Sequence, residues 1–213
     1  MSRKKDLVNC FLSLLVVILG GVALCGWVFD IDALKYIHRD WATIKPMSAI
    51  LLIISGLIPF FISSISSIAH NFRKMVVSFL VFLSFFIVFL LSFNNIQSIF
   101  LPEAYPLAQN ELLTVYPLFP SLGSLFCFLL VGIRGFMYIF STNKIKIVKA
   151  LGFLMSSVSI SSMIGLLTDH PALSFYYPGK STAMAFFSTL GALLIGIVFL
   201  NSQDNKEDDK KLL

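Results

Sequence analysis

Residues 7–29 of the chain read LVNCFLSLLVVILGGVALCGWVF and contain no Asp, Glu, Lys or Arg. About 20 apolar residues in succession are enough for a helix to cross the roughly 30 Å hydrocarbon layer of a membrane. A strand of a membrane barrel would alternate polar and apolar residues and would need only about ten of them. The stretch therefore predicts a transmembrane helix.

Five more apolar runs of this kind follow, at residues 47–69, 75–93, 118–140, 148–167 and 181–200. The 213-residue chain is 57% hydrophobic and 13% charged, with a mean hydropathy of +0.89. Soluble domains average about a quarter charged residues. We therefore expect an all-α, polytopic membrane protein with a six-helix domain at 7–200, between an N-terminal tail at 1–6 and a charged tail at 201–213.

The distribution of Lys and Arg predicts the orientation, because short cytoplasmic loops collect these residues. With a cytoplasmic N-terminus, eleven basic residues fall on the inner side and four on the outer side. The inner ones are Arg3, Lys4, Lys5, Arg73, Lys74, Lys144, Lys146, Lys149, Lys206, Lys210 and Lys211. The outer ones are Lys35, Arg39, Lys45 and Lys180. We expect a multi-pass inner-membrane protein with both termini in the cytoplasm, and its net charge of +5 requires no nucleic-acid partner.

An internal repeat is visible in the sequence. GWVFDIDAL at residues 26–34 and GLLTDHPAL at residues 165–173 share Gly, Asp, Ala and Leu at equal offsets. Each is followed by a proline, a hydroxyl residue and a new apolar run. A weaker version, FPSLGSLFCFLLVGI, lies in the middle of the chain. The pattern predicts three repeated helical hairpins.

Two longer stretches, GWVFDIDALKYIHRDWATIKPMSAILLIISGL and SMIGLLTDHPALSFYYPGKSTAMAFFSTLGALL, resemble the six-span N-terminal membrane sensor region of some bacterial histidine kinases and diguanylate cyclases. The resemblance covers most of residues 20–200. In that family a cytoplasmic output domain follows the last span, whereas here only NSQDNKEDDKKLL follows. The resemblance therefore implies a sensor-like module that acts through a separate kinase or cyclase or another membrane subunit.

The segment between the first two runs combines aromatic and charged residues. From residue 32 to residue 45, Leu34, Ile37, Trp41 and Ile44 recur at helical spacing, which predicts a short amphipathic helix lying flat on the outer surface. Trp27, Tyr36 and Trp41 suit the membrane interface, where an apolar ring with a polar edge is stable. Trp41 and Lys45 could instead face a ligand.

Polar residues of the repeat give further candidates for binding on the outer side. Asp30 and Asp169 are equivalent in the repeat, and a carboxylate there could cap the next short helix or contact a substrate. His38 with Asp40, and Asp169 with His170, could together ligate a metal, but neither pair has a diagnostic spacing. We therefore expect no metal site and no cofactor.

Four residues are assigned to helix packing or to contact with a partner. Arg134, the one charge well inside a span, could extend its long side chain to the inner headgroups or contact another helix. The Phe-rich third span, represented by Phe82 and Phe86, would face lipid or a partner subunit. Gly191 would allow close helix approach.

Catalytic patterns are missing from the sequence: we find no nucleophile paired with a base and no Gly-rich phosphate loop. We therefore expect no enzyme activity. The absence of carboxylates within the spans also disfavours ion-coupled transport. A transporter or channel for an apolar or neutral molecule, or a structural subunit of a membrane complex, remain alternatives to the sensor-like module.

Overall fold

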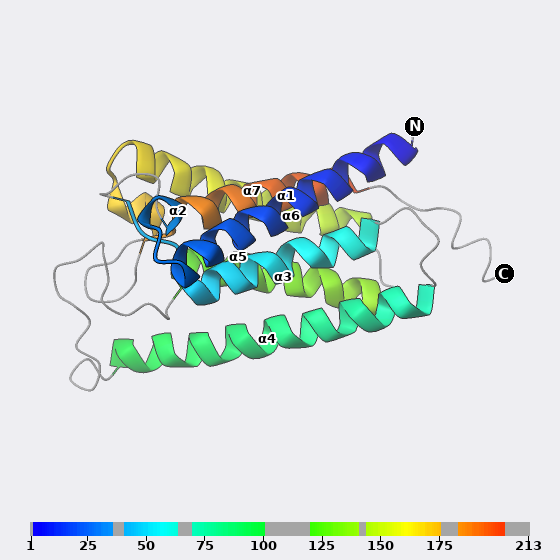
Figure 1. Cartoon of the computed structure of the whole chain (residues 1–213). Helices are drawn as coiled ribbons and strands as arrows, with labels where there is room; N and C mark the ends of the chain where they lie inside the picture. The colour runs from blue at the N-terminus through cyan, green and yellow to red at the C-terminus, as the bar shows by residue number, and fades with distance from the viewer. Residues whose placement is uncertain are drawn as a thin grey trace.

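Nearly all of the chain that can be described is helical. The computed structural model describes residues 2–35, 41–63, 70–100, 120–140, 144–175 and 183–202. Within these ranges no strand occurs. The elements are α1 (Ser2–Val28), α2 (Asp32–Lys35), α3 (Pro46–Ser63), α4 (His70–Phe100), α5 (Leu122–Ile139), α6 (Ile145–Leu167), the 3-10 helix η1 (Pro171–Ser174) and α7 (Phe186–Leu200). The fold is thus a helical bundle (Figure 1).

Five of the described helices are long and apolar enough to cross a membrane. They contain the segments Lys5–Val28, Pro46–Ser63, His70–Ser92, Leu122–Ile139 and Ile145–Leu167. The surface of these helices carries large apolar side chains, among them Phe11, Phe79 and Phe153, each more than 60% exposed. Such a surface is stable in lipid rather than in water. The chain is therefore a helical membrane protein by its composition and helix lengths.

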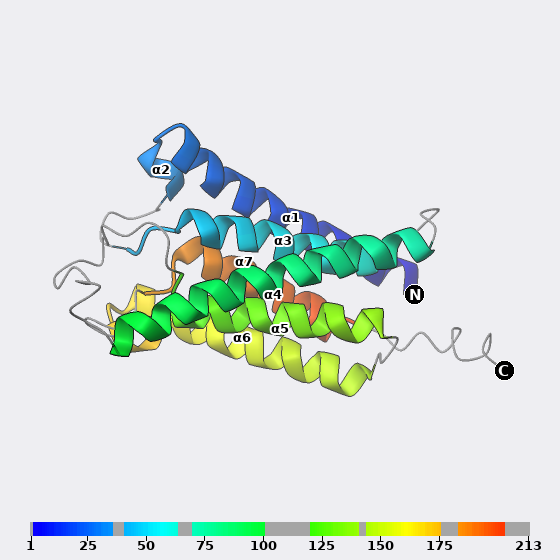
Figure 2. The ribbon, with the colours of Figure 1, turned by 90° about the horizontal axis from the view of Figure 1, so that it is seen from below.

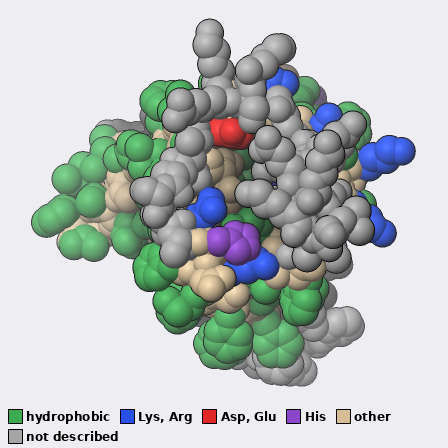
Figure 3. Space-filling model, turned by 90° about the vertical axis from the view of Figure 1, so that its right-hand side faces the viewer, with side chains coloured by type: hydrophobic (Ala, Val, Ile, Leu, Met, Phe, Trp, Pro, Cys, Tyr) green, Lys and Arg blue, Asp and Glu red, His purple; other side chains and the backbone are tan. Residues whose placement is uncertain are grey.

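The long helices run back and forth, so that the bundle has two distinct ends (Figures 1 and 2). At one end, which we call the α2 end, α1 stops and α3, α5 and α7 begin. At the other, the basic end, α1, α4 and α6 begin. The described basic residues there are Lys5, Arg73, Lys74, Lys144, Lys146 and Lys149. Figure 3 looks onto the basic end and shows Lys and Arg side chains spread over it.

Glycines bring two pairs of neighbouring helices into close contact. α1 packs most extensively against α3, and α6 against α7. A Cβ on Gly56 of α3 would lie 2.8 Å from the carbonyl oxygen of Ser13 in α1. A Cβ on Gly152 of α6 would lie 2.8 Å from the carbonyl oxygen of Gly196 in α7. In both pairs only hydrogen fits between the two backbones, as is common where membrane helices associate.

Helix α7 occupies the middle of the bundle, where it contacts α1, α3, α5 and α6. Its 15 residues are almost all apolar, and Ile195, Val198 and Phe199 are at most 2% exposed. The sequence predicts a span at residues 181–200, but the helix begins only at Phe186 because Ala185 is extended (φ −67°, ψ 150°). At 1.5 Å per residue α7 is about 22 Å long. It is therefore shorter than the five helices that are long and apolar enough to cross a membrane.

Two chain reversals at the α2 end share one backbone pattern. After α1, Asp30 has φ 52° and the amide of Ile31 donates to the carbonyl of Gly26 (2.9 Å). After α6, Asp169 has φ 52° and the amide of His170 donates to the carbonyl of Gly165 (3.0 Å). In both reversals the amide of one residue donates to the carbonyl five positions earlier, and the residue just before the donor has a left-handed conformation. This arrangement is the hydrogen bond of the Schellman motif, which ends many helices. Asp30 and Asp169 thus terminate α1 and α6, a role that the sequence did not predict. That their carboxylates cap the following short helix, or contact a substrate, stays a prediction.

The left-handed conformation of Asp169 predicts a gain in stability on substitution by glycine. A side chain in this region costs about 1 kcal/mol or more, whereas glycine adopts it freely. We expect Asp169→Gly to raise the free energy of unfolding by about 0.5–1 kcal/mol, measured by thermal unfolding in detergent. Asp30→Gly is the matched comparison, and it should gain less because it removes a contact with Lys35. Equal or lower stability of Asp169→Gly would contradict this assignment.

The structure differs from the predicted elements at two other places. α4 continues to Phe100, past the predicted end of its apolar run at residue 93. Of the amphipathic helix predicted from residue 32 to residue 45, the structure describes Asp32–Lys35 as the helix α2 and residues 42–45 as non-helical. Tyr36, His38 and Asp40 lie outside the described residues.

Candidate functional site at the α2 end

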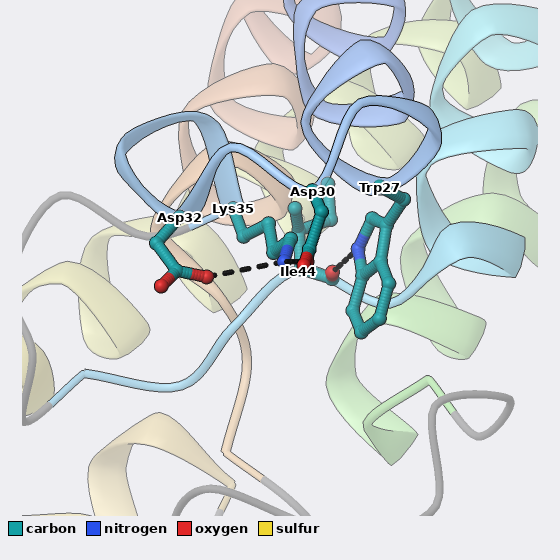
Figure 4. A network of polar contacts seen from close by, with 5 residues as sticks. All are labelled: Trp27, Asp30, Asp32, Lys35 and Ile44. Carbon is teal, nitrogen blue, oxygen red and sulfur yellow. Dashed lines mark hydrogen bonds and ion pairs between the residues drawn. The ribbon is translucent and has the colours of Figure 1, made fainter.

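Trp27 ties the end of α1 to the segment that precedes α3. Its indole Nε1 donates a hydrogen bond of 2.6 Å to the carbonyl oxygen of Ile44 (Figure 4). The amide of Ile44 in turn donates to the carbonyl of Lys35 (3.1 Å). These two bonds draw the chain back across α2 and replace the helix that the sequence predicts there. Trp27 therefore has a specific structural bond in addition to the interface position expected from its sequence.

Lys35 lies against Trp27 and between two carboxylates (Figure 4). Its Nζ is 5.2 Å from the centre of the Trp27 ring, close enough for a cation–π interaction. It donates to Asp30 and, at 3.1 Å, to Asp32. The Lys35 side chain is 9% exposed, whereas those of Asp30 and Asp32 are 93% and 68% exposed. The cation is thus covered while its acidic partners face outward.

The ion pair between Lys35 and Asp30 shifts the pKa values of both residues. The hydrogen bond and charge of Lys35 lower the pKa of Asp30. The hydrogen bond that Lys35 donates to Asp30, and then the one that it donates to Asp32, raise the pKa of Lys35. Asp30 and Lys35 therefore stay charged across the physiological pH range. Because both carboxylates are exposed to solvent, such pairs contribute little to stability and serve mainly to fix the geometry of the turn.

Lys45 lies immediately before α3, where its carbonyl accepts the amide of Ala49 (2.9 Å). Only 5% of the residue is exposed. Its Nζ contacts the hydroxyl of Thr43 at 3.4 Å. Burial lowers the pKa of Lys45 to about 8, because the charged ammonium loses hydration. An amine of this kind gains or loses its proton readily near neutral pH.

Trp41 connects the same segment to α7. Its ring stacks on that of Phe186, with 5.6 Å between centroids and 22° between planes. Phe186 is the first residue of α7. Trp27, at the end of α1, contacts the non-helical segment before α3. Trp41 lies in that segment and contacts α7. The two side chains thus link α1, α3 and α7 at the α2 end.

The polar residues of the second reversal, after α6, lack the ion pair that Asp30 forms with Lys35 after α1. Asp169 and His170 are both exposed. Among the described residues, no hydrogen bond or ion pair joins either of them to Lys35 or Lys45. At the position equivalent to Lys35 stands Ser174, whose carbonyl accepts the amide of Met184 (2.8 Å). The structure therefore groups Trp27, Asp30 and Lys35, and leaves Asp169 and His170 apart.

Metal-binding residues do not cluster in the part of the chain that the structure describes. There, no three His, Cys, Asp or Glu side chains lie close enough to hold an ion together. His38 and Asp40, one of the two pairs considered from the sequence, lie outside the described residues.

The residues assigned to packing fall into two groups. Arg134 is 7% exposed and so faces the neighbouring helices rather than lipid. A Cβ on Gly191 of α7 would lie 2.5 Å from Leu52 Cδ1 of α3, so this glycine permits close packing. Phe82 and Phe86 are 70% and 51% exposed and stack on each other with 6.3 Å between centroids. They form part of an uncovered aromatic face of α4.

The sequence reasoning overlooked Lys35 and the buried hydroxyls at the helix starts. Lys35 follows Asp30 by five residues and Asp32 by three, and the second spacing alone favours a contact on one helix face. Ser48 and Ser188 are both at most 3% exposed. Ser48 follows Pro46 by two residues, but Ser188 follows Pro178 by ten, so the repeat offered no common spacing that would predict both serines.

Comparison with known proteins adds no assignment: no protein-family model, no curated protein and no solved structure matches the chain.

Removal of the indole donor gives a direct test of this site. Trp27→Phe keeps the ring but leaves the carbonyl of Ile44 without its 2.6 Å partner. We expect the free energy of unfolding to fall by about 1 kcal/mol, the usual net value of one hydrogen bond. Trp41→Phe, which retains ring stacking on Phe186, is the control and should change less. Thermal unfolding followed by circular dichroism in detergent measures both, and an equal loss would argue against a special role for the Nε1 bond.

Proposed function

We propose that the chain is a six-span, sensor-like module of a bacterial inner membrane that acts through a separate partner protein and has no catalytic activity of its own. The observation that carries this proposal is the linkage of α1, α3 and α7 at the α2 end by Trp27 and Trp41. A stimulus that altered these contacts would shift the same three helices relative to one another. A partner could detect the shift at the basic end, where α1 starts and α3 and α7 stop.

Two features support the six spans and the hairpin repeat within this proposal. The reversals at Asp30 and Asp169 have the same φ and the same hydrogen bond, and each precedes a helix that packs back on the one before. The three non-helical residues 183–185 add up to about 10 Å to the roughly 22 Å of α7. The last hairpin could thus cross the hydrocarbon layer although its second helix is short.

The orientation proposed here places the basic end in the cytoplasm. Reporter fusions at Ser2 and Leu213 test it, because one reporter folds only in the cytoplasm and another only outside it. Both ends should give the cytoplasmic signal. Opposite signals from the two ends would remove the six-span arrangement.

Partner dependence can be tested in cells. Affinity-tagged protein is isolated in mild detergent with its bound proteins, alongside a triple variant with Trp41→Ala, Lys45→Met and Asp169→Asn. Gly21→Ala and Ile160→Val together provide a control in the middle of α1 and α6, away from both ends of the bundle. The first variant should change the amount of a kinase, a cyclase or another membrane subunit that is recovered, and the cellular response that it controls. An unchanged partner and response would refute the proposal.

A second candidate function is passage of a small neutral molecule. It is favoured by buried side-chain oxygens that have no hydrogen-bond partner in the described structure, among them Asn9 Oδ1 and the hydroxyls of Ser13, Ser55 and Ser156. They lie on α1, α3 and α6, and Pro59 in α3 additionally removes the amide that would bond to the carbonyl of Ser55. Uptake of labelled glycerol into liposomes that contain the protein, reduced by Ser55→Val, would favour this alternative. Uptake equal to that of empty liposomes would exclude glycerol as a substrate.

A further inference from the structure

Helices α3, α5 and α7 carry a glycine at the same place. Gly56, Gly132 and Gly196 are each the eleventh residue of their helix. Each of these glycines faces the long helix that precedes its own in the chain, which is α1, α4 or α6. The helix pairs α1–α3, α4–α5 and α6–α7 can therefore be compared at one equivalent contact.

In the first and the third pair this glycine lies against the backbone of the other helix. A Cβ on Gly56 would lie 2.8 Å from the carbonyl oxygen of Ser13 in α1. A Cβ on Gly196 would lie 3.1 Å from the carbonyl oxygen of Gly152 in α6. Because backbone atoms cannot move aside as the end of a side chain can, α1 is fixed closely on α3 and α6 on α7.

In the middle pair an aromatic ring separates the two helices. The three atoms nearest to a Cβ on Gly132 would all belong to the ring of Phe85 in α4, at 3.0–3.3 Å. A Cβ on Gly135, one turn further on, would meet the side chains of Val81 and Ile58. At both glycines α4 and α5 therefore touch through side chains. Their contact is also less extensive than that of the other two pairs, although α4 is the longest described helix.

Phe85 lies at the midpoint of α4, as the sixteenth of its 31 residues. The side chains of α4 that the structure describes as buried all lie between Val77 and Leu91, and none of residues 70–76 is buried. Among the described elements α4 packs chiefly on α3 and α5, at the edge of the bundle (Figure 1). The helix is thus held near its middle, whereas its start at the basic end is not covered by these neighbours.

We propose that α4 pivots about the contact of Phe85 with Gly132, and that the close-packed pairs α1–α3 and α6–α7 form the frame against which it moves. Arg73 precedes Phe85 by twelve residues. At about 1.5 Å per residue this is about 18 Å, so a tilt of about 10° displaces the start of α4 by about 3 Å. The other end of α4 moves in the opposite sense. As the route by which a shift of α3 reaches the basic end, this movement rests on the function proposed above.

Distances between pairs of spin labels on the full chain in lipid nanodiscs test the movement, in a variant whose three native cysteines are replaced by alanine. At the basic end Met75 of α4 is paired with Ile147 of α6, and at the α2 end Ser98 of α4 is paired with Leu167 of α6. The control pair joins Leu7 of α1 to Ile147, both within the frame. Both α4 pairs should give distance distributions at least twice as broad as the control pair. Equal widths overturn the proposal.

Substitution at the pivot gives a second test. Phe85→Leu shortens the side chain between the helices, so that α4 can settle on Gly132. Both α4 distributions should then narrow toward the width of the control pair. Phe82→Leu is the matched control, because Phe82 lies on the same helix but is 70% exposed, and it should leave the distributions unchanged. Equal effects of the two substitutions overturn the proposal.

The route from the α2 end is tested with Trp41→Ala, which removes the stacking on Phe186. The mean distances of the two α4 pairs should change in opposite senses, as a pivot requires. A change in the same sense, or no change, overturns the proposal.

Failure of the pivot can be distinguished from failure of the sensor-like function. Narrow α4 distributions in a protein whose partner recovery depends on the α2 end would leave the sensor-like function standing and remove the pivot. Broad α4 distributions with opposite changes, in a protein without partner or cellular response, would do the reverse.

Discussion

Replacing Gly20 by alanine is expected to lower the free energy of unfolding by about 2–3 kcal/mol, the upper part of the range found when extra atoms are forced into a packed interior. A Cβ there would lie 2.8 Å from Ile53 Cγ1 and 2.9 Å from the carbonyl oxygen of Ala49. The second contact is with backbone, so α1 and α3 would have to separate. Loss of this contact would extend along the hairpin, because the two helices pack closely again at Gly56.

The neighbouring glycine supplies the control for this substitution. A Cβ on Gly21 would have no atom within 4 Å. Gly21→Ala should therefore leave stability unchanged or raise it by up to about 1 kcal/mol, because alanine favours the helix. Unfolding midpoints of both variants in one detergent give the comparison. Equal effects would mean that α1 and α3 do not meet at Gly20.

The stability of the protein is expected to rise as the pH increases from about 8 to about 10.5, because Lys45 is buried. Its pKa falls from 10.5 in the unfolded chain to about 8 in the folded protein. Between these values the unfolded chain binds the proton and the folded protein does not, so deprotonation favours folding. A shift of this size corresponds to about 3 kcal/mol over the whole range. Lys45→Met should remove this dependence and be the more stable form at pH 7.

Lys35→Met provides the contrast in the same pH series. The pKa of Lys35 is raised, so its contribution is fully present below about pH 10.5 and is lost only as the pH rises through the folded value. From pH 7 to pH 10, the difference between Lys35→Met and the unmodified protein should stay constant. The difference for Lys45→Met should shrink over the upper part of that range. Parallel curves for Lys45→Met and the unmodified protein would show that the amine is hydrated.

The helical membrane fold could be predicted because an apolar run of about 20 residues is stable as a helix within the hydrocarbon layer of a membrane. Residues 7–29 and 148–167 fall within or almost within α1 and α6. The ends of the apolar runs did not predict where the helices end. Asn94, Asn95 and Gln97 end the apolar run of α4, yet a helix can continue in water, and α4 reaches Phe100.

The geometry of the candidate site depends on contacts that periodicity does not contain. Helical spacing from residue 32 to residue 45 predicts one amphipathic helix, but the bonds from Trp27 to Ile44 and from Ile44 to Lys35 hold a different path. Asp30 is a good capping residue by type, but its role depends on a positive φ that the sequence does not specify. Tertiary contacts override local preference at both places.

The position and length of α4 make the protein responsive to bilayer thickness. Its apolar segment His70–Ser92 has 23 residues and extends about 34 Å, slightly more than the roughly 30 Å hydrocarbon layer, and in Figure 2 the helix crosses its neighbours obliquely. Because α4 packs chiefly on α3 and α5 among the described elements and presents Phe82 and Phe86 outward, a change of its tilt would meet little resistance from those elements. Hydrophobic mismatch would therefore be absorbed at this helix, which would stand more upright in thicker membranes and lean further in thinner ones.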